Sequence, residues 1–209
     1  MKRTITILSL LAVAATGSFA AFRIAADEGG APTEHASSET ENLAAMVERG
    51  NYLVRTSACH DCHTPWKLGP NGPEPDMSRA LSGHPQDLEL PPPPPPVGPW
   101  IATFADTMTA WAGPWGVSYT ANLTSDELTG IGAWTEDIFV SAIRTGRHWG
   151  QSRPILPPMP WQVYRQMTDD DLRAIFAYLK TVPPVRNQVP APIIAGAVSP
   201  EEELAAAGF

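Results

Sequence analysis

The chain has 209 residues and a mass of 22.5 kDa, which is enough for one ordinary domain with additional coil but too short for two sizeable domains. Its formal net charge is −8 at pH 7 and its sequence pI is near 5.0, so the surface repels nucleic acid and that class of partner is excluded. An acidic surface instead suits docking onto a basic patch of another protein.

The N-terminal residues have the order of a secretory signal peptide. Lys2 and Arg3 precede an apolar run from Ile5 to about Ala15, and small residues follow up to Ala21. This order predicts a cleaved signal peptide over residues 1–21 and export of the mature chain. The alternative is an uncleaved membrane anchor, because the apolar character continues through Phe22 and reaches the lower length limit for a membrane helix.

A change of composition separates a tether from the first helix. Residues 22–40 become rich in Gly, Ser, Thr and Glu, which bury too little apolar surface to fold, so they are predicted to form a flexible tether. From residue 41 to 57 apolar residues recur on one face, which predicts a helix with Thr40 as its N-cap. Gly50 lies inside this helix, where glycine costs stability, and therefore predicts that another backbone approaches closely there.

The remaining chain is predicted to contain a proline-rich loop, two helices and a C-terminal tail. Residues 65–99 include six consecutive prolines and are predicted to form a rigid loop over the domain. Two further helices are predicted, one over 135–144 capped by Thr135 and one after Thr168 that ends before Pro183. We find no strong β alternation, with "VSYTAN" as one candidate extended segment, so residues 41–184 are predicted to form an all-α domain. Residues 185–209 are predicted to form a tail of surface coil with a short helix at "PEEEL".

Both cysteines of the chain lie in the stretch "SACHDCHTPW", where Cys59 and Cys62 are followed directly by His63. A thioredoxin-like redox pair requires a βαβ context, which helix and proline-rich coil do not provide. A structural zinc site requires four ligands, and the other histidines do not have the paired spacing of a zinc motif. The third interpretation is covalent haem attachment, since C-x-x-C-H is its signature and Cys59 and Cys62 would form thioethers while His63 reaches the iron.

Three segments make the chain resemble the class I, single-haem c-type cytochromes, especially bacterial cytochromes that serve as electron-transfer subunits of periplasmic dehydrogenases. They are "RGNYLVRTSACHDCHTPW", "YTANLTSDELTGIGAWTEDIFVSAIRTGRH" and "PPMPWQVYRQMTDDDLRAIFAYLKTVPPV". The resemblance implies the all-α cytochrome c class I fold with helices around one covalently bound haem c and long Pro-rich loops. The dehydrogenase subunits usually carry several such modules, whereas this chain has a single C-x-x-C-H.

Met159 is the candidate for the second axial ligand of the iron. It lies in "ILPPMPW", where prolines stiffen the backbone and reduce the entropy lost when the loop is held against a ring. The resemblance places the ligand methionine in a loop just before the C-terminal helix, as here. Met167 is the nearest rival, Met46, Met77 and Met108 lack a comparable frame, and His148 would give bis-histidine ligation. Tyr119 and Asn122 match a family segment near the haem edge and are expected to contact the cofactor.

The sequence thus predicts a periplasmic one-electron carrier, soluble or tethered to the inner membrane, rather than an enzyme. It would accept electrons from a dehydrogenase and pass them to another cytochrome or an oxidase. One alternative is a haem enzyme or gas sensor whose sixth coordination position is open. A second alternative is a structural subunit that is inactive without its dehydrogenase.

Overall fold

The computed structural model describes residues 34–95 and 97–196. The predicted signal peptide and the "PEEEL" helix of the tail lie outside these residues. Within the described part of the chain, no helix has an apolar stretch long enough to cross a membrane.

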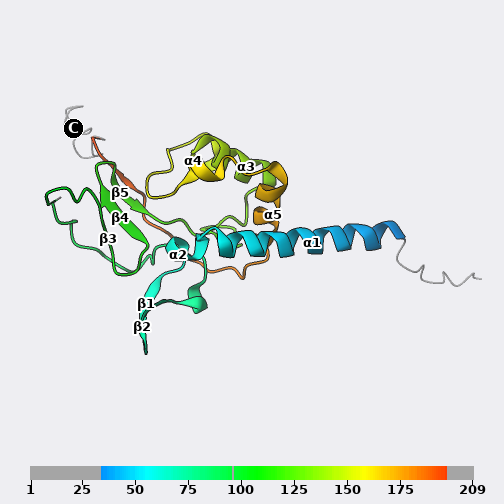
Figure 1. Ribbon diagram of the computed structural model, residues 1–209, viewed down its shortest axis with the longest axis horizontal. Helices are drawn as coiled ribbons and strands as arrows, with labels where there is room; N and C mark the ends of the chain where they lie inside the picture. Colours follow the sequence, from blue (N-terminus) through cyan, green and yellow to red (C-terminus); the bar gives the residue numbers. More distant parts are fainter. Residues whose placement is uncertain (1–33, 96, 197–209) are drawn as a thin grey trace, which may run out of the picture.

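The long helix α1 (Glu34–Thr56) packs on the C-terminal helix α5 (Asp169–Leu179), and this pair forms the centre of the domain (Figure 1). The close approach predicted at Gly50 is confirmed, because a Cβ atom placed there would lie 1.9 Å from the carbonyl oxygen of Ala174. The helix begins earlier than predicted, at Glu34, so Thr40 lies inside α1 and residues 34–40 of the predicted tether are helical.

The other two predicted helices are confirmed, including their caps. Helix α3 (Glu136–Thr145) begins after Thr135, whose hydroxyl accepts a hydrogen bond from the backbone N–H of Ile138. Helix α5 begins after Thr168, whose hydroxyl accepts from the backbone N–H of Asp171 at 3.1 Å. Three aspartates fill the first turn of α5, where the helix dipole favours negative charge.

One cluster of buried side chains joins these helices. It is formed by one face of each helix and by three loop segments, and α1 and α5 contribute most of it: Leu53, Val54, Leu81, Ile131, Phe139, Ile143, Leu172, Ile175, Phe176, Leu179 and Val182. Apolar residues at helical spacing along α5 all lie in this cluster, namely Leu172, Ile175, Phe176 and Leu179. We call this cluster the helical core.

The prediction of an all-α fold is wrong, because the described residues contain two antiparallel sheets besides five α-helices. The first sheet is a hairpin of β1 (Trp66–Gly69) and β2 (Gly72–Pro75). The second has the order β3 (Thr103–Phe104), β4 (Ala110–Gly113), β5 (Gly116–Tyr119) and β6 (Ile193–Ile194). It lies at the end of the molecule opposite the free end of α1 (Figure 1).

Only β5 overlaps a segment expected to be extended, "VSYTAN". The other strands escaped prediction because they are short, and β1, β2 and β4 also contain Gly or Pro, which lower β propensity. The turns carry the clearer signal. Both hairpins have two-residue connections, Pro70–Asn71 and Pro114–Trp115, and each is followed by a glycine with positive φ, Gly72 at 118° and Gly116 at 104°. Glycine adopts such angles without the steric cost that a Cβ atom would impose.

Two predicted irregular regions are also more ordered than expected. The segment 65–99 contains the β1–β2 hairpin and a short 3₁₀ helix, η1 (Met77–Arg79), while Pro91–Pro95 are exposed and have no regular structure. The first part of the predicted surface tail packs into the domain. Asn187 is buried, and Ile193–Ile194 extend the second sheet as β6.

Candidate functional site

Cys59 and His63 mark the ends of a five-residue helix, α2 (Cys59–His63), which follows α1 after a sharp turn. The turn is made by Ala58, whose φ of 59° lies in the left-handed region. Cys59 and Cys62 are both free and partly exposed, and Cys59 packs against the helical core. The helix therefore presents both thiols at the border between solvent and core, where a porphyrin edge can meet them.

Burial sets the protonation of these thiols. It raises the pKa of Cys59 to about 11 and also raises the pKa of Cys62, because a thiolate loses hydration there. Such surroundings favour an uncharged sulfur. A thioether is uncharged and apolar, so the environment of both sulfurs fits covalent attachment to a haem vinyl group.

His63 is buried and held by a backbone carbonyl. Its Nδ1 lies 2.8 Å from the carbonyl oxygen of Ala121, and that oxygen can only accept, so Nδ1 carries the proton. The neutral ring then has its lone pair on Nε2, the nitrogen that a metal would take. Burial also lowers the pKa of His63 and keeps the imidazole neutral.

The backbone around His63 is fixed by the segment that follows the β1–β2 hairpin. The N–H of Gly83 donates to the carbonyl oxygen of His63 at 2.8 Å, and the N–H of Leu81 donates to the hydroxyl of Thr64 at 3.0 Å. Gly83 has a φ of 76°, and a Cβ atom there would lie 2.4 Å from the carbonyl oxygen of Thr120. Gly83 thus allows the segment that carries Ala121 to lie directly against the turn after His63.

Met159 lies in the loop between η2 (His148–Gly150) and the short helix α4 (Trp161–Tyr164). Its side chain is half-buried and packs against the helical core, as Cys59 does. The loop is tied to the second sheet, since the hydroxyl of Ser118 donates to the carbonyl oxygen of Pro157 at 2.6 Å. The structure therefore shows a restrained methionine that shares an apolar environment with one of the two thiols.

The rival ligands have different surroundings. Met167 also packs against the helical core, next to the N-cap of α5, whereas Met77 is 61% exposed. His148 is half-buried rather than exposed, and its ring centroid lies 5.3 Å from that of Trp134. Met46 and Met108 are half-buried in α1 and in the turn before β4.

Asn122 and Tyr119, the two residues expected to contact the cofactor, differ in how many contacts they make within the protein. The amide of Asn122 donates to the carbonyl oxygen of Val185 at 2.8 Å and accepts from the hydroxyl of Thr124 at 2.7 Å, so protein contacts alone explain its burial. The Tyr119 ring packs against His84 with centroids 4.9 Å apart. Contact of either residue with a cofactor stays a prediction.

Two contacts at the site were not predicted from the sequence. The carbonyl of Ala121 orients His63, but a backbone acceptor has no residue-type signature. The hydroxyl of Tyr164 donates to the carbonyl oxygen of Ser57 at 2.6 Å and so ties α4 to the turn before α2. The sequence signals this tie only through the position of Tyr164, five residues after Met159.

A surface pocket of about 500 Å³ meets the C-x-x-C-H helix only at His60. Its lining includes Arg55, His60, Met77 and Tyr178, but not Cys59, Cys62 or His63. Among the described residues, no group of three or more His, Cys, Asp or Glu side chains comes together to hold a metal ion.

The geometry around the C-x-x-C-H helix agrees with comparison of the whole sequence. The sequence profile described as "Cytochrome c" matches residues 47–183. The chain belongs to the cytochrome c family. Membership implies a covalently bound haem c, and Cys59, Cys62 and His63 fit that group in spacing, burial and tautomer.

Several relatives of this cytochrome are named as parts of dehydrogenases. It is 32% identical over 148 residues to a subunit of the nicotinate dehydrogenase of Pseudomonas putida, an alignment that covers 71% of this chain and 10% of that protein. It is 31% identical over 159 residues to the cytochrome c subunit of a quinone alcohol dehydrogenase of Gluconobacter oxydans, covering 74% and 25%. The gluconate 2-dehydrogenase cytochrome c subunit of Pantoea cypripedii is 30% identical over 134 residues, covering 64% and 22%. The aligned part of this cytochrome thus spans a quarter or less of each of these relatives.

Proposed function

We propose that this cytochrome carries single electrons from a dehydrogenase to another cytochrome or an oxidase, through a haem c held by His63 and Met159. The observation that carries the proposal is the hydrogen bond from His63 Nδ1 to the carbonyl of Ala121, at 2.8 Å, beside two free cysteines on the same short helix. Haem c supplies a one-electron couple at its iron. The chain itself acts as a carrier or subunit and not as an enzyme.

The residues around the site favour electron transfer by holding ligands still. His63 is fixed through its ring nitrogen and through its own carbonyl, which accepts from Gly83 N–H. A fixed ligand keeps the same geometry in both oxidation states, so little rearrangement accompanies transfer. The apolar surroundings of Cys59 and Met159 favour the lower charge of the reduced state.

Met159 is supported as the second ligand by restraint and by burial. Prolines on both sides limit its backbone, and the bond from Ser118 to Pro157 ties the loop to β5. Tyr164, through its bond to Ser57, connects the end of this loop region to the turn that precedes the cysteines. These ties bring the methionine loop and the cysteine helix into one framework.

The partner and the location follow from the relatives and the leader. Three relatives are named as cytochrome subunits of alcohol, gluconate and fructose dehydrogenases, which supports a dehydrogenase as electron donor. The basic, apolar and small-residue order of residues 1–21 supports export to the periplasm, with a membrane tether if the leader is retained. Covalent attachment of this haem takes place outside the bacterial cytoplasm, which agrees with export.

The Met159→Ala variant tests the ligand set in protein produced with its haem. Ferric iron bonded to thioether sulfur gives a weak red charge-transfer band, which we expect in the native protein and not in the variant. The variant should also bind carbon monoxide rapidly in the ferrous state, because a coordination position becomes free. Met167→Ala is the matched control, since it removes the rival methionine from the same cluster and should keep the band.

Loss of the band in Met167→Ala but not in Met159→Ala would assign the ligand to Met167. A native protein that shows no such band and binds carbon monoxide at once has an open sixth position, and the carrier proposal then fails in favour of a haem enzyme or gas sensor.

A further inference from the structure

In one segment of this acidic chain, every residue with a formal charge is positive. Residues 138–168 contain four arginines and no Asp, Glu or Lys, so their formal charge is +4, against −12 for the remaining residues, which together give the net −8. The segment includes the Met159 loop and α4. The charge next to the candidate ligand is therefore opposite in sign to that of the chain as a whole.

Three of these arginines are available to a partner. Arg144 forms an ion pair with Asp169 and is neutralised. In the described part of the chain, Arg147, Arg153 and Arg165 are exposed and form no ion pair with a carboxylate. We call these three residues the arginine surface.

Backbone and ring contacts place the arginine surface in one region. Backbone pairing joins Arg147 to Pro154 across a small loop, and a guanidinium N–H of Arg147 donates to the carbonyl oxygen of Ser152, so Arg147 and Arg153 lie together. The guanidinium of Arg165 lies 5.6 Å from the centroid of the Trp161 ring.

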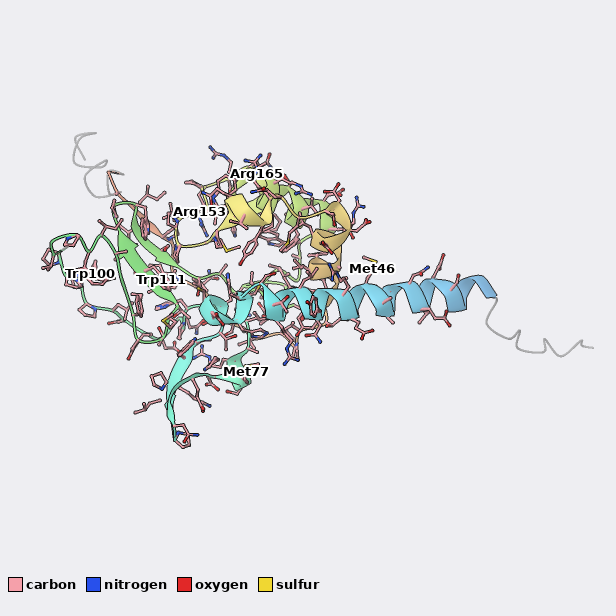
Figure 2. All side chains as sticks on the ribbon, in the orientation of Figure 1. Met46, Met77, Trp100, Trp111, Arg153 and Arg165 are labelled. Atoms are coloured by element: carbon pink, nitrogen blue, oxygen red, sulfur yellow. The ribbon has the colours of Figure 1, made fainter. Side chains whose placement is uncertain are left out.

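The same Trp161 ring lies against Gly146, the residue before Arg147: a Cβ atom on Gly146 would lie 2.3 Å from that ring. Arg165 is therefore close to the loop that carries the other two arginines. Figure 2 shows Arg153 and Arg165 beside α4, with Met77 on the opposite side of the molecule.

An exposed aromatic side chain lies next to the arginine surface. Trp149 is 41% exposed and has a φ of 57°, an angle that non-glycine residues rarely adopt. Its ring centroid lies 5.0 Å from that of Trp134, which packs against the helical core, as Met159 does. A tryptophan among arginines is the composition of protein–protein hot spots.

We propose that the arginine surface, with Trp149 beside it, is the docking site for the acidic face of a redox partner protein. The inference rests on the proposed function and adds where the partner binds and what its surface must be. Opposite charge would orient the partner toward the Met159 side despite the net repulsion between two acidic proteins. With an acceptor, ferrous haem would lose one electron and the oxidised partner cofactor would gain it; with a donor, the reduced partner cofactor would lose one electron and ferric haem would gain it.

A protein partner fits this region better than an anionic membrane. One carboxylate borders the arginine surface: Asp169, at the N-terminus of α5, pairs with Arg144, whose guanidinium also donates to the carbonyl oxygen of Arg165. A flat anionic membrane would meet this carboxylate together with the arginines. A protein face can place its acidic groups against the three guanidinium groups alone.

The salt dependence of electron transfer to small probes tests the local charge. Reduced holoprotein is mixed in a stopped-flow instrument with hexacyanoferrate(III), an anion, or with tris(phenanthroline)cobalt(III), a cation. If the net charge governs encounter, the rate with the anion rises as salt screens repulsion. If the arginine surface governs encounter, the rate with the anion falls as salt is added, which is our expected result.

Charge-neutral variants assign the effect to these residues. The triple variant Arg147→Gln, Arg153→Gln, Arg165→Gln should lower the low-salt rate with hexacyanoferrate(III) about tenfold and remove its salt dependence. The control triple Arg55→Gln, Arg79→Gln, Arg186→Gln has the same net charge and should change the rate less than about twofold. A triple Arg→Lys variant at the three surface positions keeps the charge and should retain the native salt dependence, which separates charge from folding.

Plastocyanin, a small acidic copper protein, serves as the protein probe, and vesicles of phosphatidylglycerol and phosphatidylcholine as the membrane probe. We expect the surface triple to lose electron transfer with plastocyanin at low salt. The inference is overturned if both triples have equal effects, if the native rate with the anion rises with salt, or if only vesicle binding depends on the arginine surface. The red thioether band is recorded on each sample first, so a native protein without that band refutes the proposed function separately.

Discussion

Replacement of Gly50 by alanine tests whether the α1–α5 contact determines the stability of the domain. The added Cβ atom would lie 1.9 Å from the carbonyl oxygen of Ala174 and 2.7 Å from the Cβ of Tyr178. An ordinary contact begins near 3.4 Å, so the two helices must separate by about 1.5 Å or tilt. The neighbouring atom is backbone, and rotation of a side chain cannot relieve the overlap.

The expected magnitude follows from two opposed terms. Alanine improves helix propensity by about 1 kcal/mol relative to glycine. Overpacking costs about 1–3 kcal/mol, and a backbone obstacle that also separates Leu53 and Val54 from α5 places this case at or above the upper end. We expect a net loss of roughly 2 kcal/mol, which lowers Tm by roughly 4–8 °C for a domain of this size.

Thermal unfolding of the holoprotein, followed by far-UV circular dichroism, measures the change. Ala44→Gly is the matched control, because it makes the reverse exchange at an exposed position of the same helix and reports propensity without packing. If Gly50→Ala is as stable as the native protein or more stable, then the close contact between α1 and α5 does not exist and the reasoning is wrong.

Two further predictions concern buried polar groups. Asn187→Ala should lower the free energy of unfolding by about 2–4 kcal/mol in denaturant titrations. The reason is that the Asn187 amide donates to the carbonyl oxygens of Ser82 at 2.7 Å and His84 at 2.8 Å. Gln188→Ala, at the exposed neighbouring position, is the control and should have little effect. Burial lowers the pKa of His84 below its ordinary value of 6.5, so the unfolded chain binds the proton more readily, and stability present above about pH 6.5 is lost as the pH falls below that value. His84→Gln should reduce the slope of unfolding free energy against pH by up to about 1.4 kcal/mol per pH unit just below about pH 6.5, and an unchanged slope would contradict this assignment.

Helices with full caps and regular periodicity could be predicted from the sequence. Thr135 and Thr168 stand before clear apolar stripes, and both cap their helices as expected. Of the strands, only β5 overlaps a segment expected to be extended, whereas β3 and β6 have two residues each and gain their pairing from other segments. A two-residue strand has no periodicity to detect.

At the candidate site, too, features set by a short stretch of sequence could be predicted and features set by distant residues could not. Cys59, Cys62 and His63 could be proposed from the sequence because the chemistry assigned to them depends on residue type and spacing within one short segment. The acceptor for His63 comes from a residue 58 positions away, and any residue supplies a carbonyl there. The basic surface was hidden by the net charge, because an average over the chain cancels a local excess.

The use of a main-chain oxygen to orient His63 makes the orientation of this proposed iron ligand robust to mutation. Exchange of the Ala121 side chain leaves that oxygen in place, so single substitutions at this position cannot abolish the interaction directly. A mutation that weakens this hydrogen bond has to move the backbone that carries the oxygen. Asn122 anchors that stretch through its bond to the carbonyl oxygen of Val185, so a substitution at Asn122 can displace the oxygen that faces His63.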